Sequence, residues 1–244
     1  AGLLHVDDSC RLDAIGSVAR DWVEARQEAS KASTTVQMLA YQIDGRYDQK
    51  GSAGAFVDRL HGQQGIADEL RELAALLQAR TTLPAMPLPG MEDTPLVLHA
   101  SYGIREVLTA VGWLTANRRN PFQAGVLALP ARRTELLFVT LDKSEGYHDR
   151  IAYHDYAISA ERFHWQTQNS AGPDTLAGRR YLHSAPEGWK YQLFVRVRKG
   201  DVYRACGPVL MESAEGDRPM TIIWRLASPL PVKLFREFSV LRDL

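Results

Sequence analysis

Residues 191–197, YQLFVRV, and residues 220–226, MTIIWRL, decide the fold class of the second half of this 244-residue chain. In the first stretch Leu193, Val195 and Val197 recur at every second position, which is the period of a strand that buries one face. The second stretch is rich in β-branched residues and contains a tryptophan, and both favour strands. Both stretches therefore predict β-structure.

Further strands and turns are indicated around these two stretches. Residues 136–141, LLFVTL, form another short apolar run. The dipeptides Gly172-Pro173, Gly200-Asp201 and Gly207-Pro208 mark turns. Several short strands with turns between them predict a mostly antiparallel, β-barrel-like domain, and a short helix near residues 102–112 precedes it.

The first 80 residues predict helices instead. Residues 64–80 give the clearest pattern, because apolar residues recur near helical spacing and charged residues occupy the other side. Residues 11–29 carry a second apolar stripe, and Thr34 or Thr35 is a candidate N-cap for a third helix. Residues 44–54 are expected to form a loop. The apolar stripe of the clearest helix comprises Ile66, Leu70, Leu73, Leu76 and Leu77.

A proline-rich segment separates the two patterns. Residues 81–95, TTLPAMPLPGMEDTP, contain four prolines, which remove backbone donors and disfavour helix. We interpret the segment as an extended linker. The expected fold class is α+β: a helical connector domain at 1–80, the linker at 81–95, and a β-rich domain at 96–244.

Charge and aromatic residues divide unevenly between the two regions. Residues 1–95 hold 9 Lys and Arg against 14 Asp and Glu, whereas residues 96–244 hold 20 against 15 and carry 17 of the 21 aromatic residues. A basic, aromatic-rich region is compatible with nucleic acid. No apolar run of about 18 residues predicts a membrane span or a membrane partner. Cys10 and Cys206 form no disulfide pattern, which predicts a cytoplasmic protein.

Missing motifs disfavour several classes of function. The sequence has neither GxxxxGK[ST] nor GxGxxG, the loops that bind nucleotide phosphates. It has no CxxC, HExxH or EF-hand spacing for a metal ion, and no GxSxG for a nucleophilic serine. We therefore expect no catalytic residue, no cofactor and no bound metal in this chain.

A dense polar cluster between residues 147 and 181 allows three interpretations. A metal site would draw imidazole and carboxylate ligands from His148-Asp149 and His154-Asp155. In the second interpretation the cluster is a polar loop with solvated strand faces. The third is a nucleic-acid recognition pocket, in which aromatic rings stack on a base and glutamine amides contact its edge.

The recognition interpretation gives each residue type a role. Aromatic rings stack, glutamines offer both a donor and an acceptor, and arginines bind phosphate oxygens. For Trp165 the alternative is core packing, because in a strand its neighbours point to the other face. Trp224 and Trp113 are expected in the core. The candidate nucleic-acid-binding residues are Tyr153, His154, Tyr156, His164, Trp165, Gln166, Gln168, Arg179, Arg180, Tyr181, Arg196 and Arg198.

Three long strings carry a resemblance to a known family. They are LLFVTLDKSEGYHDRIAYHDYAIS at 136–159, ERFHWQTQNSAGPDTLAGRRYL at 161–182 and PMTIIWRLASPLPVKL at 219–234. In this order they resemble an uncharacterised C-terminal domain of bacterial superfamily II helicase-like proteins. In those proteins a DEAD/DEAH-type motor, often with a phospholipase D-like nuclease ahead of it, precedes the domain. The resemblance covers residues 96–244, and the helical part is similar to the connector that follows the motor.

The resemblance implies a restriction or phage-defence protein, of which this chain, lacking motor motifs, would be the C-terminal part. It implies that the motor and nuclease do the work while the terminal domain selects the DNA. We therefore expect a non-enzymatic reader of DNA that carries a modified base or a phosphorothioate backbone. Its partners would be DNA and the helicase and nuclease regions of the same chain. The alternatives are an interaction or autoinhibitory module that docks on the motor, and a metal-dependent hydrolase built on the His/Asp cluster.

Overall fold

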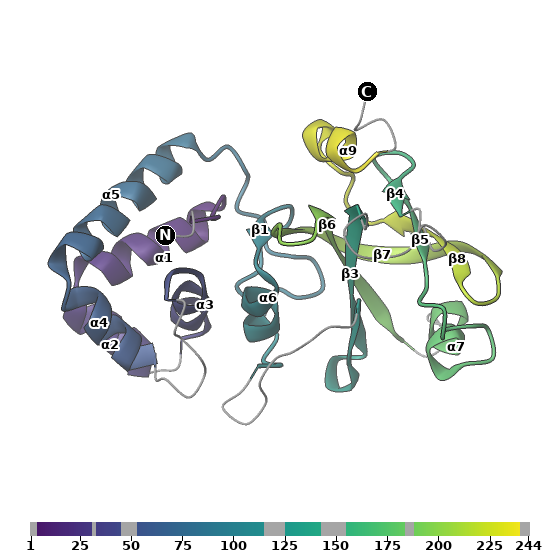
Figure 1. Ribbon diagram of the computed structural model, residues 1–244, viewed down its shortest axis with the longest axis horizontal. Helices are drawn as coiled ribbons and strands as arrows, with labels where there is room; N and C mark the ends of the chain where they lie inside the picture. The colour runs from purple at the N-terminus through teal and green to yellow at the C-terminus, as the bar shows by residue number, and fades with distance from the viewer. Residues whose placement is uncertain are drawn as a thin grey trace. The chain divides into compact units, whose positions relative to one another are not determined.

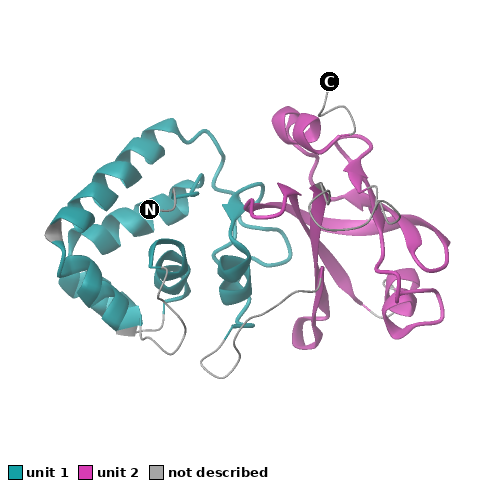
Figure 2. Ribbon diagram, in the orientation of Figure 1, with its two compact units in different colours: residues 1–122 teal, residues 123–244 magenta. Residues whose placement is uncertain are grey.

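The structure, a computed structural model, describes residues 4–30, 33–44, 53–114, 125–142, 155–183 and 188–239. The chain divides into two units, residues 1–122 and residues 123–244 (Figure 1, Figure 2). The first unit is built mainly from helices, and the second contains a β-sheet with helices against it. The α+β class is thus confirmed. In the described part of the chain, no helix is both long and apolar enough to cross a bilayer.

The first five helices of the first unit pack their apolar sides around a common core. The expected helix at 11–29 is in fact two helices, because the backbone at Asp21 is extended and ends the first of them. The helix expected near 102–112 is confirmed, whereas the sequence did not predict the one over residues 53–61. The elements are α1 (Ser9–Arg20), α2 (Trp22–Ser30), α3 (Thr34–Ile43), α4 (Ala53–His61), α5 (Gln64–Arg80), β1 (Ser101–Tyr102) and α6 (Ile104–Ala110).

The predicted apolar stripe of α5 is only partly in the core. This helix buries Ala67, Leu70 and Ala74, which lie on the side that contributes to the common core. Leu77 is half-buried. The other three stripe residues are exposed: Ile66 at 49%, Leu73 at 37% and Leu76 at 48%.

The proline-rich segment 81–95 is a hydrogen-bonded loop of the first unit, not the extended linker that the sequence predicted. The backbone N–H of Leu88 donates to the carbonyl oxygen of Leu96 over 2.8 Å, and Pro87 and Val97 form an isolated antiparallel β-bridge. Leu88 and Leu96 are buried, and this burial offsets the entropy lost in ordering the loop. The two compact units divide at 122–123.

Arg11 is the centre of a buried ionic network in the first unit. Its guanidinium donates to Asp8 Oδ2 (2.5 Å), to Glu106 Oε1 (2.8 Å) and to the carbonyl oxygen of Ser101 (2.6 Å). It also lies 4.0 Å from the ring centroid of Tyr102. Burial raises the pKa of Glu106, although the charge of Arg11 opposes that shift. The network ties the beginning of α1 to α6.

The strands of the second unit follow the order β2-β3-β6-β7-β8-β5-β4. Neighbouring strands are antiparallel except for the parallel pair β3 and β6. Their bounds are β2 (Val126–Leu129), β3 (Thr134–Asp142), β4 (Tyr156–Ala157), β5 (Arg162–Gln166), β6 (Lys190–Arg198), β7 (Tyr203–Gly216) and β8 (Met220–Leu226). A 3-10 turn, η1 (Pro130–Arg132), and the helices α7 (Leu176–Leu182) and α9 (Val232–Phe238) complete the unit.

The sheet is open, so the predicted barrel-like closure is wrong. Strands β2 and β4 stand at the two ends of the strand order, and a barrel would need these edge strands to pair. Helices α7 and α9 instead contribute apolar residues to the core on one face of the sheet, which gives that face a partner without closure. Gly207, expected in a turn, lies within β7 beside a β-bulge, and its φ is 88°.

Candidate nucleic-acid interface

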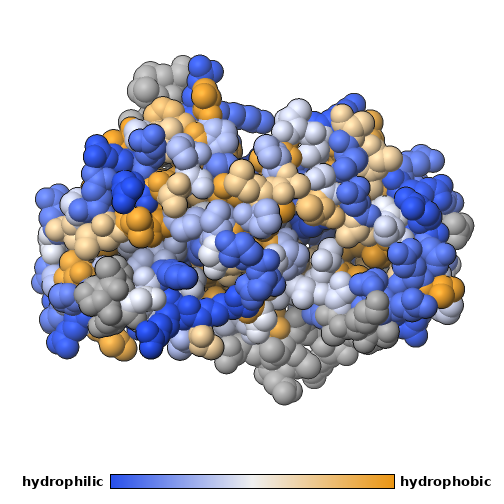
Figure 3. All heavy atoms as spheres, turned by 180° about the vertical axis from the view of Figure 1, so that it is seen from behind, coloured by the Kyte–Doolittle hydropathy of each residue, from blue (hydrophilic) through white to orange (hydrophobic). Residues whose placement is uncertain are grey.

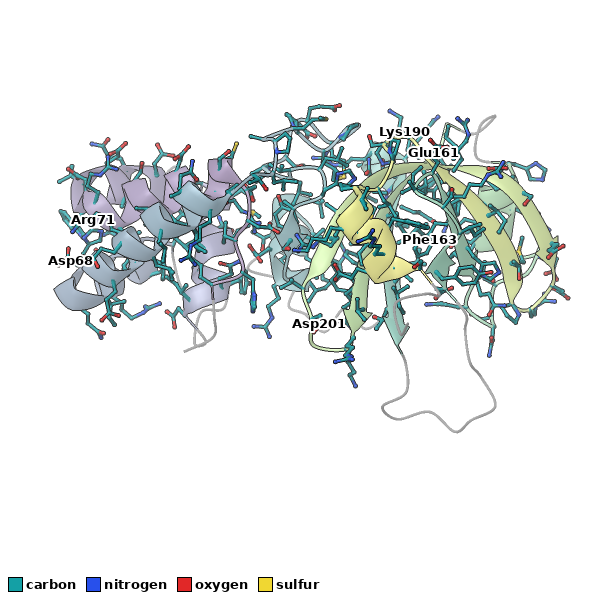
Figure 4. The ribbon with its side chains drawn as sticks, turned by 90° about the horizontal axis from the view of Figure 1, so that it is seen from above. Asp68, Arg71, Glu161, Phe163, Lys190 and Asp201 are labelled. Atoms are coloured by element: carbon teal, nitrogen blue, oxygen red, sulfur yellow. The ribbon has the colours of Figure 1, made fainter. Side chains whose placement is uncertain are left out.

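Trp165 and Tyr181, predicted to line a recognition pocket, belong to the core. Trp165 is 6% exposed and Tyr181 is 2% exposed, and their rings meet edge to face with centroids 5.5 Å apart. On β5 alternate residues point inward, so Phe163, which is labelled in Figure 4, is buried on the same face as Trp165. Trp224, expected in the core, is fully buried, whereas Trp113 is half-buried. Core packing is therefore the role that the structure gives Trp165.

Three of the predicted residues lie together on the other face of the sheet. Tyr156 on β4 is paired with His164 on β5, and their rings stack with centroids 4.9 Å and planes 9° apart. Gln166 follows on the same face of β5, and its backbone N–H donates to Asp155 Oδ1 over 2.8 Å. The three side chains are half-buried, and Gln168, just past the strand, is exposed. The face offers a stacked aromatic surface beside an amide.

Helix α7 carries Arg179 and Arg180 to the end of the sheet where β6 begins. The hydroxyl of Thr175 caps the helix by accepting from the N–H of Gly178 over 3.0 Å. At the other end of the helix, the hydroxyl of Tyr191 donates to the carbonyl oxygen of Arg180 over 2.8 Å. The Arg179 side chain is exposed, whereas Arg180 is half-buried. The helix therefore holds the two arginines in different environments.

Glu135 is a buried carboxylate that sequence reasoning did not single out. It is the partner of Tyr191 in the pairing of β3 with β6, it is fully buried, and it forms an ion pair with Arg180. Burial raises the pKa of Glu135, while the positive charge of Arg180 opposes the shift. Burial, and next the charge of Glu135, also raise the pKa of Tyr181. The ion pair fixes Arg180, whose guanidinium carbon lies 4.9 Å from the ring centroid of Trp189.

Three more cations lie at the same end of the sheet. Arg133 has a left-handed backbone (φ 48°) that closes the turn between β2 and β3, and its carbonyl oxygen accepts from the N–H of Lys190 over 2.8 Å. Arg132 precedes it in the turn, and all three side chains are exposed. We use the name basic end for the set Arg132, Arg133, Arg179, Arg180 and Lys190.

Arg196 and Arg198 lie away from the basic end, so the predicted phosphate-binding arginines do not form one surface. Strand β6 begins at Lys190 and ends at Arg198. At 3.3 Å per residue, Lys190 and Arg198 are therefore roughly 26 Å apart. Arg196 Nε donates to Thr140 Oγ1 over 2.9 Å, and its guanidinium lies 4.5 Å from the ring centroid of Tyr203. The Arg196 side chain is thus engaged by neighbouring strands of the sheet.

Acidic residues limit how far the basic end extends. Arg218 is exposed but forms ion pairs with Asp174 and Asp217. The hydrogen bond from Arg218 lowers the pKa of Asp174, so this carboxylate keeps its charge. Figure 3 shows one face of the molecule, on which hydrophilic and hydrophobic residues are mixed over short distances.

Part of the predicted cluster falls outside the described residues. Tyr153 and His154 lie there, and so do His148 and Asp149 of the metal interpretation. Among the residues that the structure does describe, no three His, Cys, Asp or Glu side chains are grouped so as to hold a metal ion. The metal interpretation therefore stays a prediction.

Sequence reasoning missed Arg132, Arg133, Lys190 and Glu135 because nothing local marks them. A pair of arginines after a proline and a lysine at a strand start are common on protein surfaces. The pairing of β3 with β6 and the position of α7 bring these residues together from segments far apart in the sequence.

The fold and this site define an α+β domain whose open sheet carries a basic end. Residues 96–238 match a family described as Domain of unknown function (DUF3427). The match covers more than half of the chain, so the chain belongs to this family. The resemblance of the C-terminal region to an uncharacterised domain is confirmed at that level. No curated protein matches the chain.

Proposed function

We propose that the chain is a DNA-binding specificity module that recognises modified DNA on behalf of a helicase- and nuclease-containing defence protein. The observation that carries this proposal is the basic end, where four exposed cations and the ion-paired Arg180 gather around the beginnings of β3 and β6. Phosphate contacts of this kind supply affinity that is independent of sequence and fix the position of the duplex. The basic end is therefore the part that grips the DNA.

We assign recognition of the DNA modification to the sheet face that bears Tyr156, His164 and Gln166. In the strand order β5 is three strands from β6, roughly 14 Å at 4.8 Å per strand. This distance is close to the major-groove width of about 12 Å. Because α7 packs against the opposite face, a duplex held by its phosphates at the basic end must pass the end of the sheet to present its base edges to this face.

The geometry favours a modified base over a modified backbone. Two stacked rings and a glutamine amide match a base, which presents a π-face and a patterned edge. His164 Nδ1 is buried and has no hydrogen-bond partner within the described residues, and a group on the base could donate to it or accept from it according to the tautomer of the ring. If the base is flipped out of the duplex, these contacts must offset an unstacking cost of a few kcal/mol.

A binding series tests the proposal. The chain is titrated with plain, base-modified and phosphorothioate duplexes of one sequence over a range of salt concentrations. We expect tightest binding to one base-modified duplex, and affinities for all three that fall as salt rises. Failure to bind any of the three at low salt would remove the proposal, and preference for the phosphorothioate duplex would overturn the assignment to a base.

A further inference from the structure

The exposed side of α5 carries an apolar stripe with one charge of each sign in it. Ile66, Leu73 and Leu76 are each more than one-third exposed, and their spacing is that of the a and d positions of a heptad repeat. Glu69 and Arg80 complete the same spacing at the exposed positions between and after them. At 100° per residue, the five side chains project from one side of the helix.

This stripe is distinct from the other two sides of α5. One of these faces the core of the first unit, through Ala67, Leu70 and Ala74. The other bears Asp68 and Arg71, which form an ion pair with each other at 3.1 Å (Figure 4). The stripe therefore joins exposed apolar area to two charges of opposite sign.

We propose that the stripe is the surface on which α5 pairs with α5 of a second copy of this chain, in antiparallel orientation about a two-fold axis. The axis passes between Leu73 and Leu76, so each of them faces the other residue in the second copy. The same register sets Glu69 opposite Arg80 of the second copy, and Arg80 opposite its Glu69. Four of the five stripe positions then meet a complementary one within the helix, whereas Ile66 faces residue 83 of the second copy, beyond the end of α5.

The charges select the antiparallel arrangement and disfavour the parallel one. Parallel pairing would bring Glu69 against Glu69 and Arg80 against Arg80, and like charges across an interface are costly. The stripe therefore favours a partner whose acidic and basic residues stand in the reverse order. A second copy of the chain, related by a two-fold axis, supplies that order. The pairing needs no residue of the basic end.

The predicted dimer is weak and depends on concentration. Stable interfaces bury at least about 1,200 Å², and one helix from each copy buries less than that. An interface of this smaller size is typical of transient complexes. Even a transient dimer would carry two DNA-binding units. Once one unit binds a duplex, the effective concentration of the other near that duplex is raised, so the affinity of the dimer for DNA increases. The inference stands without the proposed function, since self-association requires no DNA.

Sedimentation velocity of the whole chain over a concentration series tests this interface. We expect a monomer–dimer equilibrium that Leu73→Glu with Leu76→Glu abolishes. Glu69→Arg and Arg80→Glu should each weaken dimerisation by about tenfold or more, since each creates two like-charge contacts. The double variant Glu69→Arg/Arg80→Glu should restore wild-type association. The matched control is Asp68→Arg, the same reversal of charge one residue away on another side of the helix.

Three results would overturn the proposal. They are a monomer at every concentration, single reversals that leave the dimer unchanged, and a double reversal that fails to recover association. Circular dichroism of each variant separates loss of the interface from loss of the helix. Because DNA is absent from these measurements, they remain interpretable if the chain binds no duplex at all.

Discussion

The buried carboxylate of Glu135 is ion-paired with the guanidinium of Arg180, which links β3 to α7 at the basic end. The side chain of Glu135 is fully buried and that of Arg180 is 18% exposed. Removing one partner of a buried pair typically costs about 3–5 kcal/mol, because the other charge is left without compensation. The pair thus fixes Arg180 within the basic end, whose exposed cations are Arg132, Arg133, Arg179 and Lys190.

Replacing Arg180 by leucine should destabilise the second unit in a pH-dependent way. Burial already raises the folded-state pKa of Glu135 above its ordinary value, and loss of the guanidinium would raise it further. The folded state then binds a proton more readily than the unfolded state. Stability is therefore fully present below the unfolded pKa and is lost as pH rises through the folded one. We expect a loss of about 3 kcal/mol at neutral pH.

Urea denaturation at neutral and at acidic pH checks this expectation. The difference between Arg180→Leu and the wild type should shrink in acid, where Glu135 is protonated and no longer needs a partner. Arg179→Leu is the control, since that side chain is exposed. An equal loss at both pH values would contradict the role given to Glu135.

Replacing exposed cations of the basic end should weaken binding to every duplex, modified or plain. Arg133→Ala and Lys190→Ala each remove one phosphate contact, so each should lower the slope of log affinity against log salt by about one. Arg198→Ala, at the far end of β6, should leave the slope unchanged. Fluorescence anisotropy over a salt series measures all three. Equal effects of the three substitutions would argue against a localised grip.

Trp165→Ala and His164→Ala should separate packing from reading. Trp165 is 6% exposed, so its truncation should cost about 3–5 kcal/mol of stability. His164 lies on the other face of β5, and its truncation should cost about 1 kcal/mol or less while reducing discrimination between marked and plain DNA. Denaturation curves and competition binding give the two quantities. The reading face would be misassigned if His164→Ala bound both duplexes as the wild type does.

Local pattern was sufficient to predict three of the strands but not how the sheet ends. The alternation at 191–197 and the β-formers at 220–226 correspond to β6 and β8, because side-chain period and propensity are properties of neighbouring residues. Whether β2 and β4 pair is decided by contacts between distant segments, so sequence could not distinguish a barrel from an open sheet. The burial of Leu88 within the proline-rich segment was not predicted for the same reason.

The candidate site was predicted in composition but not in placement. Strand alternation places residues 164 and 165 on opposite faces, yet nothing local says which face is covered. Trp165 is inside and His164 outside because α7 and α9 contribute to the core on the side of Trp165. Arg180 was expected to bind a phosphate, but its guanidinium forms an ion pair with Glu135 of β3. No sequence motif marks that carboxylate.

Gly178 should be irreplaceable for docking of α7, although it sits in a helix where alanine is normally preferred. A Cβ at Gly178 would lie 1.9 Å from the carbonyl oxygen of Gly172, so the helix would have to move away from the loop before it. Gly178→Ala should therefore lose about 1–3 kcal/mol. Gly16→Ala in α1 is the matched control, because a Cβ there meets nothing within 4 Å, and it should gain up to about 1 kcal/mol. Chemical denaturation of both variants decides the matter: if both substitutions stabilise the protein, α7 is not held against that loop.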